Sequence, residues 1–178
     1  MGRHEVRIAG FGGQGVVMAG FILGKAAALY DDKDVVFSQS YGPEARGGAC
    51  AAEVIIDDEA VDYPVVSHPD VVVLMSQEAA AKYTGDLSDQ ATIIVDQDLV
   101  NLMADREVHS APTTRMAEDL GRRMVANIAM LGYVTAVTGL TSRNAMEEAI
   151  KTTVPPKTIE LNLRAFSAGY DYATRSLS

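Results

Sequence analysis

The sequence predicts an α/β protein: a three-layer α/β/α sandwich around a mostly parallel, mixed sheet. Short β-branched runs alternate with longer helical patterns, which is the arrangement of repeated strand–helix–strand units. Two of these runs, 70–75 and 91–95, are almost continuously apolar, as is typical of strands covered on both faces. No repeat, low-complexity tract or linker divides the 178 residues, so 1–178 are expected to form one domain.

Glycines separate the first strand from the first helix. Val6 and Ile8 alternate with polar neighbours in 5–10, which predicts a strand that runs into a tight turn. Residues 15–30 predict a helix in which Lys25 is the only charged residue. Because this helix is apolar nearly all round, it should be buried on more than one side and need a partner for its outer face.

The middle of the chain is expected to complete the sheet. β-Branched and aromatic residues predict strands over 34–40 and 49–57, on either side of a glycine-rich loop. An acidic turn at 57–59 and a short return near 61–66 predict a hairpin with the second of these strands, which makes the sheet mixed. The remaining elements follow in chain order: strand 70–75, short helix 77–83, strand 91–95 ending at Asp96, and strand 107–111.

The C-terminal third predicts helices. Residues 116–138 form either one helix or two that separate near Gly121. The stretch 124–142 has no charged residue and approaches the length of a membrane span. Its polar residues and two glycines favour a buried core helix instead.

Two amphipathic helices are expected at the end of the chain. Ser142 should cap the helix 143–152, and Glu147 and Lys151 should form an i,i+4 ion pair within it. The two prolines at 155–156 should end that helix. The last helix, 158–175, carries an apolar stripe that should pack on the same core. The stripe consists of Ile159, Leu163, Phe166, Tyr170 and Ala173.

Charge and cysteine content exclude several classes of function. The 15 Lys plus Arg against 24 Asp plus Glu give a net charge of −9, which argues against general nucleic-acid binding and against adsorption to an anionic membrane. Cys50 is the only cysteine, so this chain forms no intrachain disulfide and cannot supply four thiolates to an iron–sulfur cluster. The first residues lack the apolar core of a secretory signal, so a cytoplasmic location is expected.

The sharpest local feature is the segment GFGGQG at 10–15, which satisfies the G-x-G-x-x-G pattern between a predicted strand and a predicted helix. It predicts a Rossmann-like first βα turn, in which backbone N–H groups face a phosphate. Three aspartates between 31 and 34 lie where a dinucleotide fold places its ribose carboxylate. The alternative is a tight turn whose glycines only permit close packing. The candidate binding residues are Gly10, Gly12, Gly13, Gln14 and Gly15.

The loop SQSYGPEARGG at 38–48 is the second candidate. Its candidate binding residues are Ser40, Glu44, Arg46 and Gly47. Arginine can donate two parallel hydrogen bonds to a carboxylate or a phosphate, here or across an interface. The alternative is an exposed Glu–Arg pair that contributes roughly 0–1 kcal/mol. We expect the two glycine-rich loops to meet at one edge of the sheet.

No other residue predicts chemistry. The three histidines lack metal-ligand spacing, and no G-x-S-x-G elbow is present. Cys50 opens an apolar strand, which favours a buried, inert thiol. We therefore assign no catalytic residue and no metal ligand to this chain.

Together the two loops resemble a known family. GFGGQGVVMAGFILGKAAAL followed by SQSYGPEARGGACAAEVIID is similar to the gamma subunit of 2-oxoacid:ferredoxin oxidoreductases, and most similar to the 2-oxoglutarate type. The similarity continues through DVVVLMSQEAAAKY, ATIIVDQDLV, NIAMLGYVTAVTG and NLRAFSAGYDY, and so covers most of the chain. The pairing of a GxGGQG turn with an ExRGG loop is more specific than either motif alone.

The resemblance implies a thiamine-diphosphate enzyme that decarboxylates a 2-oxoacid, forms an acyl-CoA and reduces ferredoxin. Gly85-Asp86-Leu87 departs from the family's GDG motif for diphosphate and magnesium. Thiamine diphosphate, magnesium and iron–sulfur clusters are therefore expected in partner subunits, named alpha, beta and delta in this family. This chain is expected to support the active site or to contact coenzyme A through the glycine turn and Arg46. The isolated chain is expected to self-associate.

Other functions stay open at this point. Within the resemblance, a subunit of indolepyruvate oxidoreductase has a similar pattern. The G-x-G-x-x-G turn also suits a free-standing NAD(P)-dependent dehydrogenase. A regulatory domain that binds a nucleotide without chemistry is the third alternative.

Overall fold

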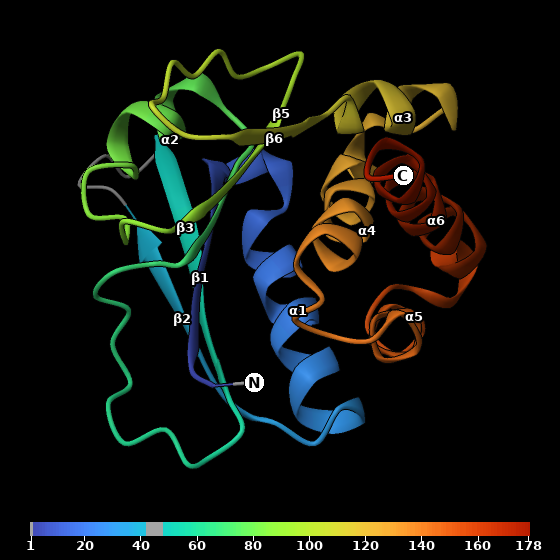
Figure 1. Ribbon diagram of the computed structural model, residues 1–178. Coiled ribbons are helices and arrows are strands. Elements are labelled where there is room, and N and C mark those ends of the chain that lie inside the picture. The colour runs from blue at the N-terminus through green and yellow to red at the C-terminus, as the bar shows by residue number, and fades with distance from the viewer. Residues whose placement is uncertain (1, 42–47) are drawn as a thin grey trace.

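The computed structural model describes residues 2–41 and 48–178, and their strands form one mixed sheet (Figure 1). The sheet has six strands in the order β2-β3-β1-β4-β5-β6. β1, β4, β5 and β6 run parallel to one another, whereas β3 is antiparallel to both β1 and β2. The predicted mixed, mostly parallel sheet is therefore confirmed. The strands are β1 His4–Phe11, β2 Asp34–Tyr41, β3 Ala49–Asp57, β4 Val71–Leu74, β5 Thr92–Asp96 and β6 Val108–Ala111.

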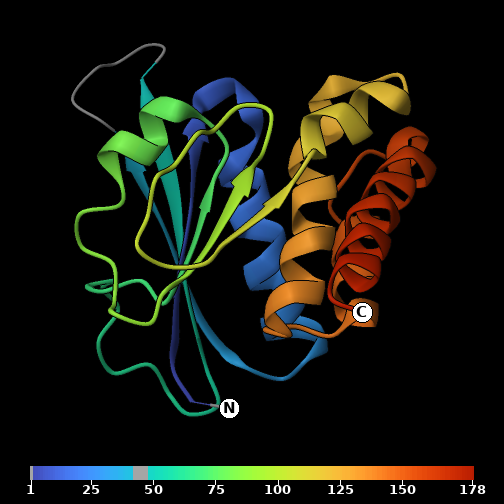
Figure 2. The same ribbon diagram turned by 45° about the horizontal axis from the view of Figure 1, so that its top comes forward.

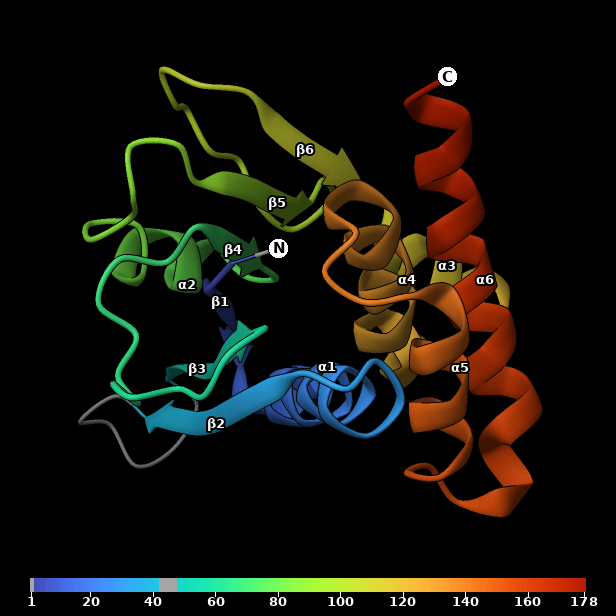
Figure 3. The same ribbon diagram turned by 60° about the horizontal axis from the view of Figure 1, so that its bottom comes forward.

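Helices cover the two faces of this sheet unequally (Figure 3). α1 and α4 lie over one face, with α5 and α6 outside them, and the short α2 lies over the other face. This is the predicted three-layer arrangement, with α2 and connecting segments as the third layer. The helices are α1 Val16–Tyr30, α2 Gln77–Lys82, α3 Thr113–Asp119, α4 Ala126–Thr138, α5 Arg143–Lys151 and α6 Ile159–Ser176. Single 3₁₀ turns lie at Gly12–Gln14, Arg123–Val125 and Pro156–Thr158.

The predicted hairpin between 49–57 and 61–66 is wrong. Both edges of β3 are already occupied, since His4 pairs with Ile56 on one side and Asp34 pairs with Asp57 on the other. Residues 61–66 contain no strand, and Pro64 among them lacks the N–H that a sheet ladder needs. The strand that forms a sequential antiparallel pair with β3 is β2, which precedes it in the chain. Residues 42–47, which join the two strands, lie outside the described residues.

Alternation along β1 divides the core between the two faces. Val6 and Ile8 are fully buried in the larger cluster, which also contains the inner faces of α1, α4 and α6. Ala9 belongs to the smaller cluster beneath α2. All four residues of β4 are buried, as expected for a strand covered on both faces.

Of the two alternatives for 116–138, the structure has two helices that separate at Gly121. Gly121 has a φ of +87°, in the left-handed region that ends helices, and it separates α3 from α4. α4 is buried from Ala126 to Thr135, so the long uncharged stretch forms a core helix (Figure 2). Among residues 2–41 and 48–178, no helix has the length and apolar character needed to cross a bilayer.

One of the predicted helix contacts is confirmed and another is wrong. Ser142 caps α5, because its Oγ accepts a hydrogen bond from the Ala145 N–H at 3.1 Å. Glu147 pairs with Arg143 at 2.9 Å, and Lys151 pairs with Glu148 at 2.8 Å, so the predicted Glu147–Lys151 pair does not form. The guanidinium of Arg143 lies 4.6 Å from the centre of the Tyr170 ring, which holds it in reach of Glu147.

The apolar stripe of α6 is only partly buried. Phe166 and Ala173 are fully buried, whereas Ile159 and Leu163 line an open groove beside Leu120. The buried face is rotated toward small residues, because α4 and α6 approach each other closely where they cross. This face consists of Asn162, Ala165, Phe166, Gly169 and Ala173.

Candidate functional site

The glycine segment lies where the parallel strands of the sheet end. After β1, residues Gly12–Gln14 form a 3₁₀ turn, and Gly15, with a φ of +71°, leads into α1. Met75 and Asp96 mark the same edge at the ends of β4 and β5. Ligands of open parallel sheets bind at this edge, outside the carboxyl ends of the strands.

Gln14 holds the turn against the sheet. Its Oε1 accepts a hydrogen bond from the Phe11 N–H at 2.8 Å, and its Nε2 donates to the Met75 carbonyl at 2.7 Å. Gly10 lies directly beneath this amide, and a Cβ built on it would be 2.5 Å from Gln14 Oε1. Both residues therefore shape the turn from inside the fold.

Asn127 holds the turn from the opposite side. Its Nδ2 donates to the Gly15 carbonyl at 3.1 Å, and its Oδ1 accepts from the Ile128 N–H at 2.9 Å in the first turn of α4. A Cβ on Gly15 would lie 2.5 Å from Asn127 Nδ2, in addition to its positive φ. Glycine at position 15 is therefore required by both the backbone conformation and the close approach of Asn127. Asn127 was not among the predicted site residues.

Gly12 and Gly13 form the open face of the turn. Both are exposed, and nothing lies within 4 Å of a Cβ built on either. A cavity of about 260 Å³ adjoins them, with Gly13, Met75, Thr114 and Arg123 in its wall. The 3₁₀ turn before α1 and the first residue of α4, Ala126, lie in its wall. The exposed Arg123 adds a guanidinium, which also pairs with Glu118 at 3.5 Å. This arrangement suits an anionic group.

Asp96 supports the far wall of this cavity. The residue is fully buried, and its Oδ2 accepts hydrogen bonds from the Thr113 hydroxyl at 2.7 Å and from the Thr114 hydroxyl and N–H at 2.8 Å. Its Oδ1 accepts from the Asp98 N–H at 3.1 Å. The carboxylate therefore ties the start of α3 to the end of β5 and positions Thr114. In the sequence, the only indication of this role is that Asp96 is the single acidic residue at the end of the apolar run ATIIVD.

The second loop leaves the sheet at the same edge. Tyr41, Cys50 and Gly10 lie side by side in register on β2, β3 and β1. Ser40 is the last predicted site residue before the gap, and it pairs with Ala51. The remaining candidates, Glu44, Arg46 and Gly47, lie outside the described residues. Cys50 is buried, and burial raises the pKa of its thiol. The neutral thiol is therefore favoured over the reactive thiolate, which agrees with the interpretation of Cys50 as inert.

The aspartates that a dinucleotide fold would place on a ribose lie elsewhere. Asp31 ends α1 and accepts hydrogen bonds from the Ser142 N–H and hydroxyl, both at 2.7 Å. Asp34 begins β2 and accepts from the Val61 N–H at 2.6 Å. The 15 residues of α1 separate them from the glycine turn, about 22 Å at 1.5 Å per residue. This geometry disfavours the dinucleotide alternative.

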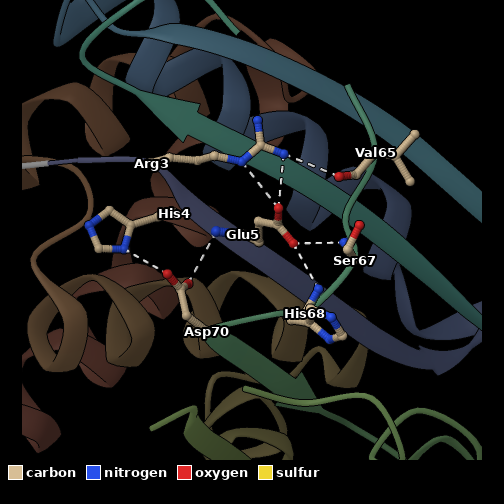
Figure 4. A network of polar contacts seen from close by, with 7 residues as sticks. All are labelled: Arg3, His4, Glu5, Val65, Ser67, His68 and Asp70. Carbon is tan, nitrogen blue, oxygen red and sulfur yellow. Dashed lines mark hydrogen bonds and ion pairs between the residues drawn. The ribbon is translucent and has the colours of Figure 1, made fainter. Parts of the chain in front are cut away.

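A polar network at the opposite edge of the sheet anchors the segment before β4 (Figure 4). Glu5 accepts from Arg3 at 2.9 Å and from the N–H groups of Ser67 and His68 at 2.7 and 3.0 Å. Asp70 accepts the Glu5 N–H at 3.1 Å and contacts His4 Nδ1 at the same distance. Among the described residues, no cluster of His, Cys, Asp and Glu suits a metal ion. The network is therefore interpreted as structural.

Glu5→Gln should weaken folding by about 1 kcal/mol at neutral pH, because the charged acceptor of four hydrogen bonds, from Arg3, Ser67 and His68, is lost. Burial raises the pKa of Glu5, but its bonds to Arg3, His68 and Ser67 outweigh burial and hold that pKa below its usual value. The contribution is thus present above the unfolded pKa of about 4.3 and is lost as pH falls through the folded pKa. Urea unfolding from pH 7 to 3 checks this. The difference in the free energy of unfolding between the variant and wild type should shrink in acid, and a difference that stays constant with pH would contradict the prediction. Glu59→Gln, at an exposed position, is the control.

Comparisons with known proteins agree on one family. Residues 5–172 match the family described as pyruvate ferredoxin/flavodoxin oxidoreductase. The chain is 49% identical over 176 residues to the 2-oxoglutarate synthase subunit KorC of Methanocaldococcus jannaschii, covering 96% of this chain and 94% of that one.

Two solved structures share its fold. The keto/oxoacid ferredoxin oxidoreductase gamma subunit of Geobacter sulfurreducens superposes with a TM-score of 0.88 at 41% identity, covering 98% of both chains. The second is the 2-oxoglutarate:ferredoxin oxidoreductase of Magnetococcus marinus, solved with 2-oxoglutarate, coenzyme A and succinyl-CoA bound. It gives a TM-score of 0.86 at 20% identity over 98% of this chain and 32% of that one, and so shows likeness of fold alone.

Proposed function

The chain belongs to the pyruvate ferredoxin/flavodoxin oxidoreductase family, and we propose that it is the gamma subunit of a 2-oxoglutarate:ferredoxin oxidoreductase. The observation that carries this proposal is the 49% identity to a 2-oxoglutarate synthase subunit along 96% of the chain. The complex decarboxylates the 2-oxoacid oxidatively, forms the acyl-CoA and passes electrons to ferredoxin. The whole chain acts in it as one domain. A subunit of indolepyruvate oxidoreductase is the weaker alternative, because the 49% identity is to a 2-oxoglutarate synthase subunit.

The redox and decarboxylation chemistry belongs to partner subunits in this proposal. One cysteine cannot supply the four thiolates of a cluster. Asp86, in the segment that replaces the family's GDG motif, donates no free carboxylate to magnesium, because both its oxygens accept from Arg7 at 2.6 and 3.0 Å. Thiamine diphosphate, which supplies the carbanion chemistry, and magnesium do not fit this chain. In this proposal they belong, with the iron–sulfur clusters, to the partner subunits alpha, beta and delta.

This chain contributes a wall of the coenzyme A site. Gly12 and Gly13 leave room for a phosphate against the backbone, and the start of α1 favours negative charge there by about 0.3–1 kcal/mol. Arg123 beside the cavity, which also pairs with Glu118 at 3.5 Å, and Arg46 of the second glycine-rich motif supply cations for the other phosphates of this ligand. The clamps at Gln14 and Asn127 hold the turn ready, so little ordering is needed on binding.

Gly13→Asp tests this role in the assembled enzyme. The new carboxylate would occupy open space without disturbing the fold, and it would repel an approaching phosphate. We expect the KM for coenzyme A to rise at least tenfold, with the KM for the 2-oxoacid unchanged, in steady-state assays of ferredoxin reduction. Gly85→Asp, also in open space but away from the turn, is the matched control. Arg46→Glu should act in the same direction as Gly13→Asp. Unchanged coenzyme A kinetics in both variants would refute the role.

The outer face of α1 is the surface by which this subunit meets the catalytic subunits. Met18, Phe21 and Leu29 are exposed on it, between 45% and 67%. An apolar helix face of this kind is covered in a stable complex. The self-association expected of the isolated chain follows from the same residues.

A further inference from the structure

A second hollow adjoins the glycine turn and has no role in the coenzyme A site. It is a groove of about 400 Å³ between the first turns of α1 and α4 and the corner that joins α5 to α6. Met124, 75% exposed, lines both this groove and the smaller cavity at the turn, so the two are neighbours on one surface. The groove is lined mainly by apolar side chains, among them Met18, Met124, Val154 and Leu161.

The charges at this groove are all of one sign. Arg122 and Lys157 line it, and none of its lining residues carries a carboxylate. In the part of the chain that the structure describes, neither cation has an ion-pair partner. This local positive charge contrasts with the net charge of −9 of the chain. The groove therefore selects an occupant that is apolar at its centre and negative at its edges.

A buried amide adds a polar contact to the groove. Asn162 is 7% exposed and lines it, and its Nδ2 donates to the Thr158 carbonyl at 2.9 Å within α6. No described residue donates to its Oδ1. An N–H group of a bound segment could donate a hydrogen bond to the Asn162 Oδ1.

We propose that the groove docks a segment of a partner subunit that presents an apolar side chain flanked by carboxylates. The proposal rests on the proposed function, because it requires that the chain work in a multisubunit complex. A protein segment fits better than a small ligand, because the exposed Met18 and Met124 line the groove, and Phe21, one turn along α1 from Met18, is exposed as well. Methionine and arginine are both enriched in protein interfaces, where methionine adapts to irregular apolar partners.

The test uses the complex co-expressed from all its subunits, with the tag on a partner. In the double variant Arg122→Glu/Lys157→Glu, the amount of this chain that co-purifies with its partners in low salt should fall at least tenfold. Wild-type association should weaken as salt increases, and that salt dependence should vanish in the variant. Met124→Glu, at an exposed position that does not affect folding, should weaken association similarly. Lys82→Glu/Arg106→Glu changes the net charge equally on the opposite side of the sheet and should assemble as wild type does.

Three outcomes would overturn the proposal. Unchanged association and salt dependence in the double variant would do so directly. Normal assembly with a raised KM for coenzyme A would assign the groove to the substrate instead. A wild-type chain that dimerises alone through this groove, with the double variant monomeric, would make the occupant a second copy. Failure of the proposed function is distinguishable, since the wild-type chain would then not co-purify with its partners at all.

Discussion

Gly132→Ala and Gly169→Ala are each expected to destabilise the chain by about 3 kcal/mol, although each adds one methyl group. A Cβ on Gly132 would lie 2.0 Å from the Phe166 carbonyl oxygen, and one on Gly169 would lie 1.8 Å from the Ala129 carbonyl oxygen. The obstacle is backbone in both cases, so no side-chain rotation relieves it. α4 and α6 must separate along their crossing, which disturbs the packing of the fully buried Phe166.

This cost exceeds the gain in helix propensity. Replacing a helical glycine by alanine gains about 0.5–1 kcal/mol in the absence of a clash. Gly24→Ala in α1 is the matched control, because its Cβ would meet side-chain methyl groups and no backbone, Val35 Cγ1 at 3.3 Å and Val54 Cγ1 at 3.7 Å. Urea unfolding followed by circular dichroism should place Gly24→Ala within about 1 kcal/mol of wild type, and both other variants far below it. Variants at 132 and 169 as stable as wild type would show that the helices can separate freely.

Local sequence patterns were sufficient to predict most elements of this fold. The apolar runs at β4 and β5 and the glycine at the end of α3 depend on short-range chemistry, and the structure confirms them. Strand pairing depends on distant segments. β3 pairs with β1, whose residues lie 38 to 52 positions earlier, and that partner excluded the expected return at 61–66. Arg143, which pairs with Glu147 in place of Lys151, also contacts Tyr170 in another helix.

At the candidate site, too, some features follow from the local sequence and others depend on distant residues. The pattern at 10–15 located the turn, because glycine spacing reports backbone conformation directly. Its clamps could not be read from spacing, since Gln14 bonds to a carbonyl 61 residues away and Asn127 to one 112 residues away. Asn127 was nevertheless visible as a polar residue at the start of an otherwise apolar helix. A buried polar side chain in such a place needs a specific partner.

Asp96→Ala is expected to cost about 3–5 kcal/mol of folding stability and to impair the site. Four donors lose their acceptor: the hydroxyls of Thr113 and Thr114 and the N–H groups of Thr114 and Asp98. Since Asp96 is fully buried, water does not replace it without rearrangement. Thr114 lines the cavity beside Gly13, so the start of α3 would shift against the glycine turn.

Asp96→Asn separates the acceptor role of this residue from its charge. The amide oxygen can still accept from Thr113 and Thr114, but its NH₂ group then faces the Asp98 N–H, donor against donor. We expect a loss of about 1–3 kcal/mol, smaller than for alanine. In the assembled enzyme the KM for coenzyme A should rise less in Asp96→Asn than in Asp96→Ala. Asp98→Ala, which removes only an exposed ion pair with Arg115, is the control and should cost less than about 1 kcal/mol. Equal losses in the asparagine and alanine variants would mean that the charge of Asp96, rather than its three bonds to α3, holds this wall in place.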